Sequence, residues 1–211
     1  SGWIKLDMDI SLLQECRVLP VVTPLDVDST VELAAALHRG GMKAIEITLR
    51  SASAMDSISA VHEAVPDILV AAGTVNTPAD LARVEAAGVQ LALSPGATPD
   101  LLAAAAASSL SFIPGIASAS ELMQGMANGF SVFKLFPAEA LGGRAMLKSL
   151  GGPFPEVRFC PTGGLNPDNF RDYLALDNVV CCGGSWMVAE NLVRGGKWDE
   201  IESLAREAVS D

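Results

Sequence analysis

Basic residues are scarce in this sequence: 14 lysines and arginines stand against 25 aspartates and glutamates, and the formal net charge is −11. Binding to nucleic acid or to an anionic membrane depends on clustered basic side chains, and no such cluster is present. Charged residues of either sign make up only 18% of the chain, below the roughly 25% that is usual for soluble domains. We therefore expect neither nucleic acid nor an anionic membrane as a partner, and a partly apolar surface that includes an oligomer contact.

Metal-binding residue types are also few. The two histidines, His38 and His62, fall within helical patterns rather than at strand ends, which disfavours a histidine-ligated zinc or iron site. The four cysteines show no Cys-x-x-Cys spacing, and the adjacent Cys181 and Cys182 would face opposite sides of a strand, which suits neither a disulfide nor a chelate. We expect buried thiols and no cofactor, while carboxylate-bound magnesium is disfavoured but stays open.

Long hydrophobic runs are absent. The longest uncharged stretch, residues 101–120, is interrupted by Pro114-Gly115 and is rich in alanine and serine, so it is not a membrane span. The first residues lack the positive flank and apolar core of a secretion signal. We expect a cytoplasmic protein, in which residues 1–7 are either foreign to the natural chain or a flexible N-terminus.

Short β-branched or apolar runs alternate with Ala/Leu-rich helical patterns after an amphipathic N-terminal stretch at residues 8–16, which we expect to be a helix. This alternation is typical of βα units and a parallel sheet. Eight runs are predicted to be strands: residues 18–23, 44–48, 68–72, 91–94, 111–113, 132–135, 158–162 and 179–182.

Local signals for helix ends support the alternation. Asp28-Ser29 is predicted to open the first helix after the first strand, and Gly40-Gly41 to close it. Thr77-Pro78 and Asn166-Pro167 each place a cap before a proline in the first turn. Eight repeats favour a single (β/α)8 barrel domain over residues 1–211, whereas a doubly wound open sheet, which often carries a Gly-x-Gly-x-x-Gly turn, is the alternative.

Lys134 is the most informative residue, because it is a single ammonium within the apolar run 132–137. On a strand it shares a face with Val132 and Phe136. Desolvation disfavours the charged form and leaves a neutral amine that can attack a carbonyl to form a Schiff base. The alternative is a strand-end lysine that reaches the solvent.

A second polar face alternates with apolar residues in the run that starts at Ala44. Glu46, Thr48 and Arg50 share one face, and a barrel strand directs such a face toward its interior and C-terminal mouth. A carboxylate and a guanidinium there could serve chemistry. They could equally form a buried ion pair that only neutralises both charges.

Further candidates follow other predicted strands. Thr74 and Pro95 come directly after the third and fourth runs, where ordinary turn chemistry is the alternative explanation. Thr162-Gly163-Gly164 follows the seventh run and Gly183-Gly184-Ser185 the eighth. Barrels often hold a phosphate on exposed backbone N–H groups at this position, so we predict a phosphate site there.

The order of these segments resembles the 2-keto-3-deoxy-6-phosphogluconate (KDPG) and 4-hydroxy-2-oxoglutarate (KHG) aldolase family. The resemblance rests on residues 46–50, 72–74, 94–96, 133–139, 159–164 and 183–186, of which 133–139 and 158–164 are the most specific. Members are metal-independent class I aldolases, usually trimers of (β/α)8 barrels, so the resemblance implies a homotrimer without cofactors.

The resemblance also implies a role for each matching residue. Lys134 would form the Schiff base and Glu46 would be the general acid and base. Arg50, Thr74 and Pro95 would surround the pyruvate carboxylate, Phe136 and Thr162 would shape the pyruvyl pocket, and Gly163, Gly164, Gly184 and Ser185 would receive the phosphate.

Several alternatives stay open within this interpretation. Galactonate-type relatives tend to carry an arginine near the end of the first strand, where residues 21–24 have none, which favours the gluconate substrate. The same iminium chemistry would also split 4-hydroxy-2-oxoglutarate. A phosphate-binding isomerase in which Lys134 forms no covalent bond and a non-catalytic sensor of phosphorylated sugar acids are the other possibilities.

Overall fold

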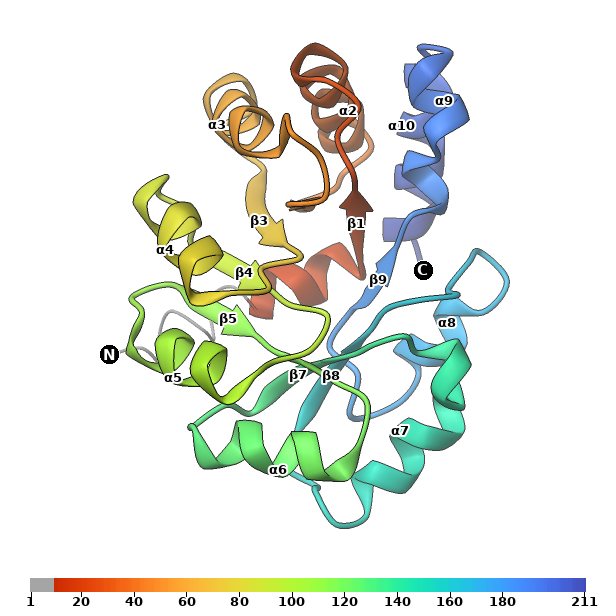
Figure 1. The fold of residues 1–211 in the computed structure, drawn as a ribbon. Coiled ribbons are helices and arrows are strands. Elements are labelled where there is room, and N and C mark those ends of the chain that lie inside the picture. The colour runs from red at the N-terminus through yellow and green to blue at the C-terminus, as the bar shows by residue number, and fades with distance from the viewer. Residues whose placement is uncertain (1–9) are drawn as a thin grey trace.

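Parallel strands surrounded by a ring of helices form the molecule (Figure 1). The computed structural model describes residues 10–211, so residues 1–7, for which we made an N-terminal prediction, lie outside the described part. The strands are β1 (Val18–Val22), β2 (Ala44–Thr48), β3 (Leu69–Gly73), β4 (Leu91–Leu93), β5 (Ser111–Ile113), β6 (Gly115–Ile116), β7 (Val132–Leu135), β8 (Arg158–Pro161) and β9 (Cys182–Gly184). The predicted α/β barrel is confirmed.

The barrel closes through two sheets. Six strands follow the order β5-β4-β3-β2-β1-β9, and three follow the order β6-β7-β8, with parallel pairing throughout. One residue, Pro114, separates β5 from β6, so a single stretch of chain pairs with β4 first and with β7 afterwards. The joint between β8 and β9, here called the β8/β9 seam, is made by the isolated bridges Phe159–Val179 and Thr162–Gly183.

Helices follow the strands and cover their outer faces (Figure 1). They are α2 (Val27–Arg39), α3 (Ala54–Ala64), α4 (Pro78–Ala86), α5 (Pro99–Ala107), α6 (Ala119–Ala127), α7 (Gly143–Gly151), α8 (Phe170–Leu174), α9 (Glu190–Arg194) and α10 (Trp198–Val209), with the short 3-10 helices η1 (Glu139–Leu141) and η2 (Trp186–Val188). Among residues 10–211, no helix has the length and apolarity needed to cross a membrane.

Several helices begin where a side chain satisfies a free backbone N–H. Thr77 accepts a hydrogen bond from the N–H of Asp80 before α4, and Thr98 does the same before α5. Each helix then has a proline in its first turn, where no donor is lost. These caps set the points at which the loops leave the barrel.

The barrel interior contains an apolar layer, here called the lower layer. Its buried residues are Leu13, Leu19, Ala44, Ala71, Leu91, Leu93, Ile113, Val132, Cys160, Val180 and Cys181. Leu13 belongs to a helix at residues 10–16, so the expected N-terminal helix is present over its described part and contributes to this layer. A second, larger cluster fills the space between the strands and the surrounding helices.

The thiols are buried, and the described cysteines are free. Cys181 lies in the lower layer, whereas Cys182 packs in the outer cluster, as alternation on a strand requires. The Cys160 and Cys181 sulfur atoms are 3.1 Å apart. The hydrogen bond with Cys160 and burial both raise the pKa of the Cys181 thiol, so Cys181 stays protonated and packs as a small apolar side chain.

The predicted strands 18–23, 68–72, 91–94 and 158–162 differ from the observed ones by one residue, and three other predicted boundaries are wrong. The last strand spans Cys182–Gly184 rather than 179–182, because Val179 forms only an isolated bridge with Phe159. The first predicted helix is capped by Asp26, whose carboxylate accepts from the N–H of Ser29, so Asp28-Ser29 lies inside α2. Asn166-Pro167 forms a turn before α8 rather than opening it.

Candidate active site

Lys134 lies in the middle of β7 with its side chain inside the barrel. Its N–H donates to the carbonyl of Pro114 at 2.9 Å, and Cys160 is its neighbour on β8. Only 6% of the residue is exposed, so the side chain does not reach the solvent. The Nζ atom is 5.2 Å from the centre of the Phe136 ring. The amine is therefore held in a largely apolar setting.

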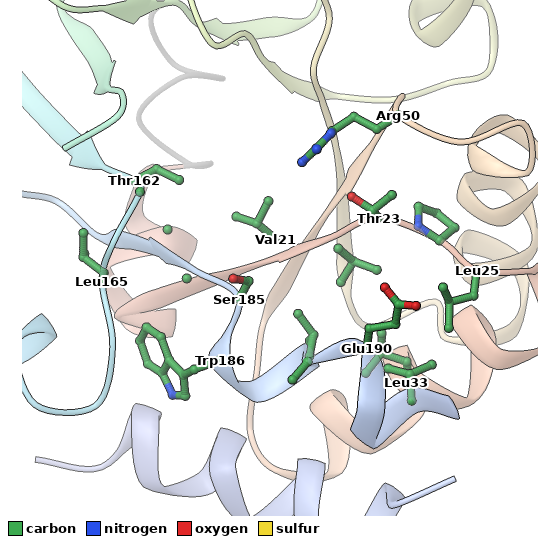
Figure 2. A pocket seen from close by; sticks show the side chains of 18 of the residues that line it. Val21, Thr23, Leu25, Leu33, Arg50, Thr162, Leu165, Ser185, Trp186 and Glu190 are labelled. Atoms are coloured by element: carbon green, nitrogen blue, oxygen red, sulfur yellow. The ribbon is translucent and has the colours of Figure 1, made fainter. Parts of the chain in front are cut away.

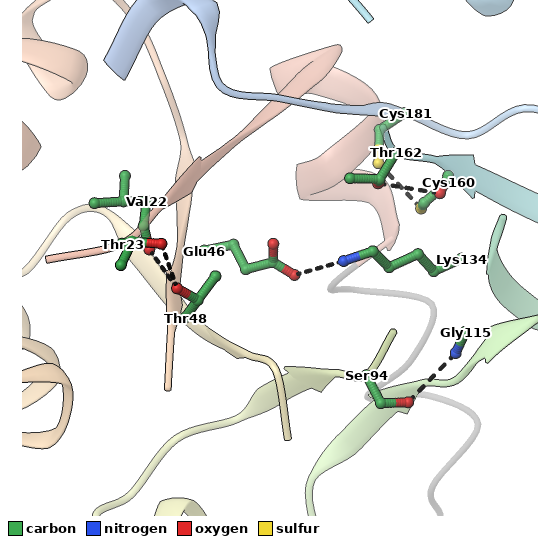
Figure 3. Close-up of polar contacts among 10 residues, drawn as sticks. All are labelled: Val22, Thr23, Glu46, Thr48, Ser94, Gly115, Lys134, Cys160, Thr162 and Cys181. Atoms are coloured by element: carbon green, nitrogen blue, oxygen red, sulfur yellow. Dashed lines mark hydrogen bonds and ion pairs between the residues drawn. The ribbon is translucent and has the colours of Figure 1, made fainter. Parts of the chain in front are cut away.

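Glu46 reaches toward Lys134 from the opposite wall, on β2 (Figure 3). Its Oε1 is 3.8 Å from the Lys134 Nζ, and the residue is 1% exposed. Neither carboxylate oxygen accepts a hydrogen bond from any described residue. Since buried carboxylates normally have hydrogen-bond partners, this acid is placed where its oxygens are free to bind or transfer a proton.

Gly73, on β3, makes room for this carboxylate. A Cβ atom at position 73 would lie 2.8 Å from both Cγ and Cδ of Glu46, closer than carbon atoms pack. The absence of a side chain on the neighbouring strand thus fixes the place of Glu46. The sequence shows the glycine at position 73, but no local pattern reveals that it lies against Glu46 on the neighbouring strand.

Hydroxyl groups continue the polar face above Glu46. The Thr48 hydroxyl donates to the Val22 carbonyl at 3.0 Å and lies 3.0 Å from the hydroxyl of Thr23 (Figure 3). Thr48 was expected on the inner face with Glu46, and it is buried there. Thr23 was not among the predicted site residues, because its partner belongs to another strand and no local pattern reveals the pair.

Arg50 follows β2 and extends its guanidinium into a cavity of about 530 Å³ (Figure 2). It forms no hydrogen bond or ion pair with the described residues, and Glu46 is paired with Lys134 instead. The alternative in which Glu46 and Arg50 neutralise each other is therefore wrong. A free guanidinium at a cavity suits a carboxylate ligand.

The cavity brings together seven of the predicted residues from separate loops, and Phe136 connects it to the buried amine. They are Arg50, Phe136, Thr162, Gly163, Gly164, Gly184 and Ser185. The other four, Lys134, Glu46, Thr74 and Pro95, are not part of its lining. Thr74 directly follows β3 and adopts a left-handed backbone with φ of 55°, a conformation that is uncommon outside glycine.

Backbone donors gather at one end of the cavity. The N–H groups of Gly163, Gly164 and Ser185 have no hydrogen-bond acceptor within residues 10–211. Gly163 and Gly164 have φ values of 108° and 80°, which favour glycine. Free N–H groups in such a loop are suited to bind an anion such as phosphate.

Gly183 and Gly184 are the last two residues of β9 rather than part of a loop after it. A Cβ at Gly183 would meet the Thr162 side chain, and one at Gly184 would overlap the Trp186 ring. Gly183 thus allows the two sides of the β8/β9 seam to approach each other, and Gly184 leaves room for the Trp186 ring. The residues predicted to form a glycine loop here line the cavity, but the strand ends later than predicted, and the phosphate site stays a prediction.

Other cavity residues were missed by the sequence reasoning. Leu33 of α2, Trp186 of η2 and Glu190 of α9 line it as well (Figure 2). Glu190 is paired with Arg194 at 2.7 Å, which offsets its negative charge at the rim. Within residues 10–211, no group of three or more His, Cys, Asp or Glu side chains is placed to hold a metal ion.

A parallel barrel that encloses a buried lysine beside a carboxylate, next to a cavity with an arginine and free backbone donors, has the features of a Schiff-base enzyme. The family model for KDPG and KHG aldolase matches residues 10–204. The chain thus belongs to the KDPG and KHG aldolase family.

Individual relatives agree with this assignment. The chain is 50% identical over 210 residues to the 2-dehydro-3-deoxy-phosphogluconate aldolase of Pseudoalteromonas atlantica, covering 100% of this chain and 97% of the relative. It is 49% identical over 199 residues to the KHG/KDPG aldolase of Escherichia coli K12, covering 94% and 93%. The KDPG aldolase of Legionella pneumophila, with pyruvate captured at low pH as a covalent carbinolamine intermediate, superimposes with a TM-score of 0.92 at 44% identity, covering 96% of this chain and 98% of that structure.

Proposed function

We propose that this protein is a class I aldolase that cleaves 2-dehydro-3-deoxy-6-phosphogluconate to pyruvate and glyceraldehyde 3-phosphate. The observation that carries this proposal is the buried amine of Lys134, 3.8 Å from a Glu46 carboxylate that no other described group binds. An amine activates a 2-oxo acid by forming an iminium, and a nearby carboxylate then moves the protons. Full-length similarity to aldolases of this family supports the same activity.

The reaction follows from these two side chains. The Lys134 amine attacks the C2 ketone, and loss of water gives an iminium. The iminium accepts the electron pair of the C3–C4 bond as that bond breaks. Glu46, directly or through water, takes the C4 hydroxyl proton and glyceraldehyde 3-phosphate leaves. Glu46 then returns a proton to the enamine carbon, and hydrolysis releases pyruvate and the free amine.

Binding groups complete the proposal. Arg50, Thr74 and Pro95 would surround the substrate carboxylate, which the guanidinium would hold through a two-point contact. Phe136 and Thr162 would shape the pyruvyl pocket. The phosphate would be bound by Gly163, Gly164, Gly184 and Ser185. This local arrangement would outweigh the repulsion that an overall charge of −11 exerts on an anionic substrate.

A second activity is cleavage of 4-hydroxy-2-oxoglutarate to pyruvate and glyoxylate. The iminium chemistry concerns only the pyruvyl half of the substrate, and the relative from E. coli, 49% identical, bears both names. For the galactonate-derived substrate, the similar structure named KDPGal is only 24% identical and supports the fold alone. Cleavage rates on all three substrates would establish the preference.

Borohydride trapping tests the covalent step. Reduction in the presence of pyruvate should add a stable mass to the peptide that contains Lys134 and leave the peptide with exposed Lys43 unmodified. A non-covalent isomerase would give no such adduct, and a sensor would bind the sugar acid without releasing pyruvate. An absent adduct at Lys134 would refute the aldolase proposal.

Glu46→Gln tests the proton-transfer step in the same assay. Turnover should fall by roughly 10² to 10⁴, the usual value of general acid and base catalysis, while pyruvate is still trapped on Lys134. Full activity in this variant would remove Glu46 from the mechanism.

Three broader expectations belong to the proposal. We infer a single barrel domain, a homotrimer and a cytoplasmic location. The low charged fraction is consistent with a buried oligomer contact, and Met123 and Met126 of α6 are large apolar side chains that stand exposed on the single chain. Light scattering of the purified protein would measure the oligomer number.

A further inference from the structure

Glu139 belongs to the distinctive segment 133–139, but the reaction above gives it no role. It begins η1, shortly after β7 and Lys134. Its Oε1 accepts a hydrogen bond from the hydroxyl of Tyr173 on α8. The Tyr173 residue is fully buried, and burial together with the Glu139 carboxylate raises the pKa of its hydroxyl. Tyr173 therefore remains a protonated donor to Glu139.

The stem of Glu139 packs directly against the backbone of Gly164. A Cβ atom at position 164 would lie 2.6 Å from the Glu139 Cβ and 2.7 Å from its Cγ, so no side chain fits between them. The Glu139 N–H also donates to the Gly163 carbonyl at 3.1 Å. One residue thus contacts both glycines whose N–H groups are free at the cavity.

The same helix that carries Tyr173 holds this loop from its other side. Asn169, the residue before α8, donates from its side-chain amide to the Gly164 carbonyl at 3.2 Å. The Asn169 side-chain oxygen, Oδ1, accepts a hydrogen bond from the backbone N–H of Asn166 at 2.9 Å. Gly164 is therefore held between Glu139 on one side and Asn169 on the other, and the Tyr173–Glu139 hydrogen bond connects these two sides.

We propose that Glu139 is a positioning residue for the substrate phosphate, which it orients by fixing the Gly163-Gly164 backbone between η1 and α8. This proposal rests on the proposed function, because it assumes that these glycines bind the phosphate. The Glu139 carboxylate itself accepts from Tyr173 and is not part of the cavity lining. Its loss should therefore weaken recognition of the phosphorylated end while the chemistry at Lys134 continues.

The proposal is tested by comparing a phosphorylated ligand with one that lacks phosphate. Glu139→Ala should raise KM for 2-dehydro-3-deoxy-6-phosphogluconate about tenfold, as expected when binding groups are displaced by a fraction of an ångström, with little change in kcat. The pyruvate concentration needed for half-maximal borohydride trapping on Lys134 should stay at the wild-type value. Tyr173→Phe should act in the same direction with a smaller effect.

Two further variants separate positioning from general damage. Glu139→Gln keeps an oxygen that accepts from Tyr173 and keeps the stem against Gly164, so it should restore most of the wild-type KM. Glu156→Ala removes an exposed carboxylate elsewhere on the surface and should leave both measurements unchanged. An equal rise for the substrate and for pyruvate trapping, or no change in KM for both Glu139→Ala and Tyr173→Phe, would overturn the positioning role.

The wild-type assay keeps the two proposals apart. If wild-type protein releases no pyruvate from the phosphorylated substrate, the proposed function itself fails. If wild-type protein is active and the variants lose nothing specific to the phosphorylated substrate, only the role of Glu139 fails.

Discussion

Two layers of the barrel interior differ in chemistry although the same strands build both. In β2, Ala44 belongs to the apolar lower layer and Glu46, two residues on, is buried above it. In β7, Val132 and Lys134 show the same step. Because residues two apart on a strand share a face, the change from apolar to ionic chemistry takes place over a single step along each strand.

The difference shows that stability and chemistry come from different layers of the barrel interior. The clustered residues of the lower layer are apolar side chains and thiols, so their burial stabilises the fold. The layer above contains a lysine and a carboxylate with unused hydrogen-bonding capacity, which destabilises a folded protein. The lower layer thus provides the stability that allows the upper one to be arranged for chemistry.

The largest effect is expected from replacing Lys134 on β7 with an apolar side chain like those of the lower layer. Lys134→Met keeps the length of the side chain but removes the nucleophile, so turnover should fall by about 10⁴-fold or more in a coupled assay for pyruvate. Val132→Ala, on the same face of the same strand, is the matched control and should leave kcat essentially unchanged. A substantial residual activity in Lys134→Met would contradict the assignment of the chemistry to the layer that contains Lys134.

A smaller loss of activity is expected from Gly73→Ala. The added methyl group would lie 2.8 Å from Glu46 and should push its carboxylate away from Lys134, lowering kcat by about 10². Gly152→Ala is the control, because its Cβ would meet only ordinary contact at 3.6 Å. A Gly73→Ala variant with wild-type kcat would show that the carboxylate position tolerates displacement.

The lower layer should respond in stability rather than in activity. Leu91 is fully buried there, and Leu91→Ala should lower the free energy of unfolding by about 2–5 kcal/mol, as measured by urea denaturation. The folded variant should keep its kcat at 25 °C. A drop in kcat without loss of stability would contradict the assignment of stability to this layer.

The smallest effect concerns the surface, far from both layers. Hydrogen bonds from Arg206 and Arg39 lower the pKa of Glu202. A carboxylate with a lowered folded-state pKa stabilises the fold above its unfolded-state pKa, and this contribution disappears as pH falls through the folded-state value. Wild-type protein should therefore exceed Glu202→Gln slightly in stability near neutral pH, and urea denaturation at pH 3 should show a smaller difference. An equal difference at both values would contradict this.

Sequence patterns predicted the features that depend on local chemistry. The first seven strand positions, the cap at Thr77 and the inward faces of Glu46 and Lys134 all follow from alternation or from a single turn of chain. The resemblance to a known family then located residues that periodicity alone does not connect.

Contacts between distant segments could not be predicted in this way. Glu46 pairs with Lys134, 88 positions away, rather than with Arg50 in the same run, because the barrel curvature decides which walls face each other. The same holds for Gly73 beneath Glu46 and for Tyr173 beside Glu139. The late start of β9 likewise depends on pairing with β1, where Val18 is opposite Cys182, and not on the apolar run at 179–182.

The β8/β9 seam has a consequence for the bound enzyme. Isolated bridges, rather than a continuous ladder, join the barrel wall there, and the glycines proposed to receive the phosphate flank it on both sides. A phosphate bound between them would accept hydrogen bonds from both sides of the seam and hold β8 and β9 together. Substrate analogues should accordingly slow amide exchange at Gly163 and Ser185 together, so that the barrel is most firmly closed while it is occupied.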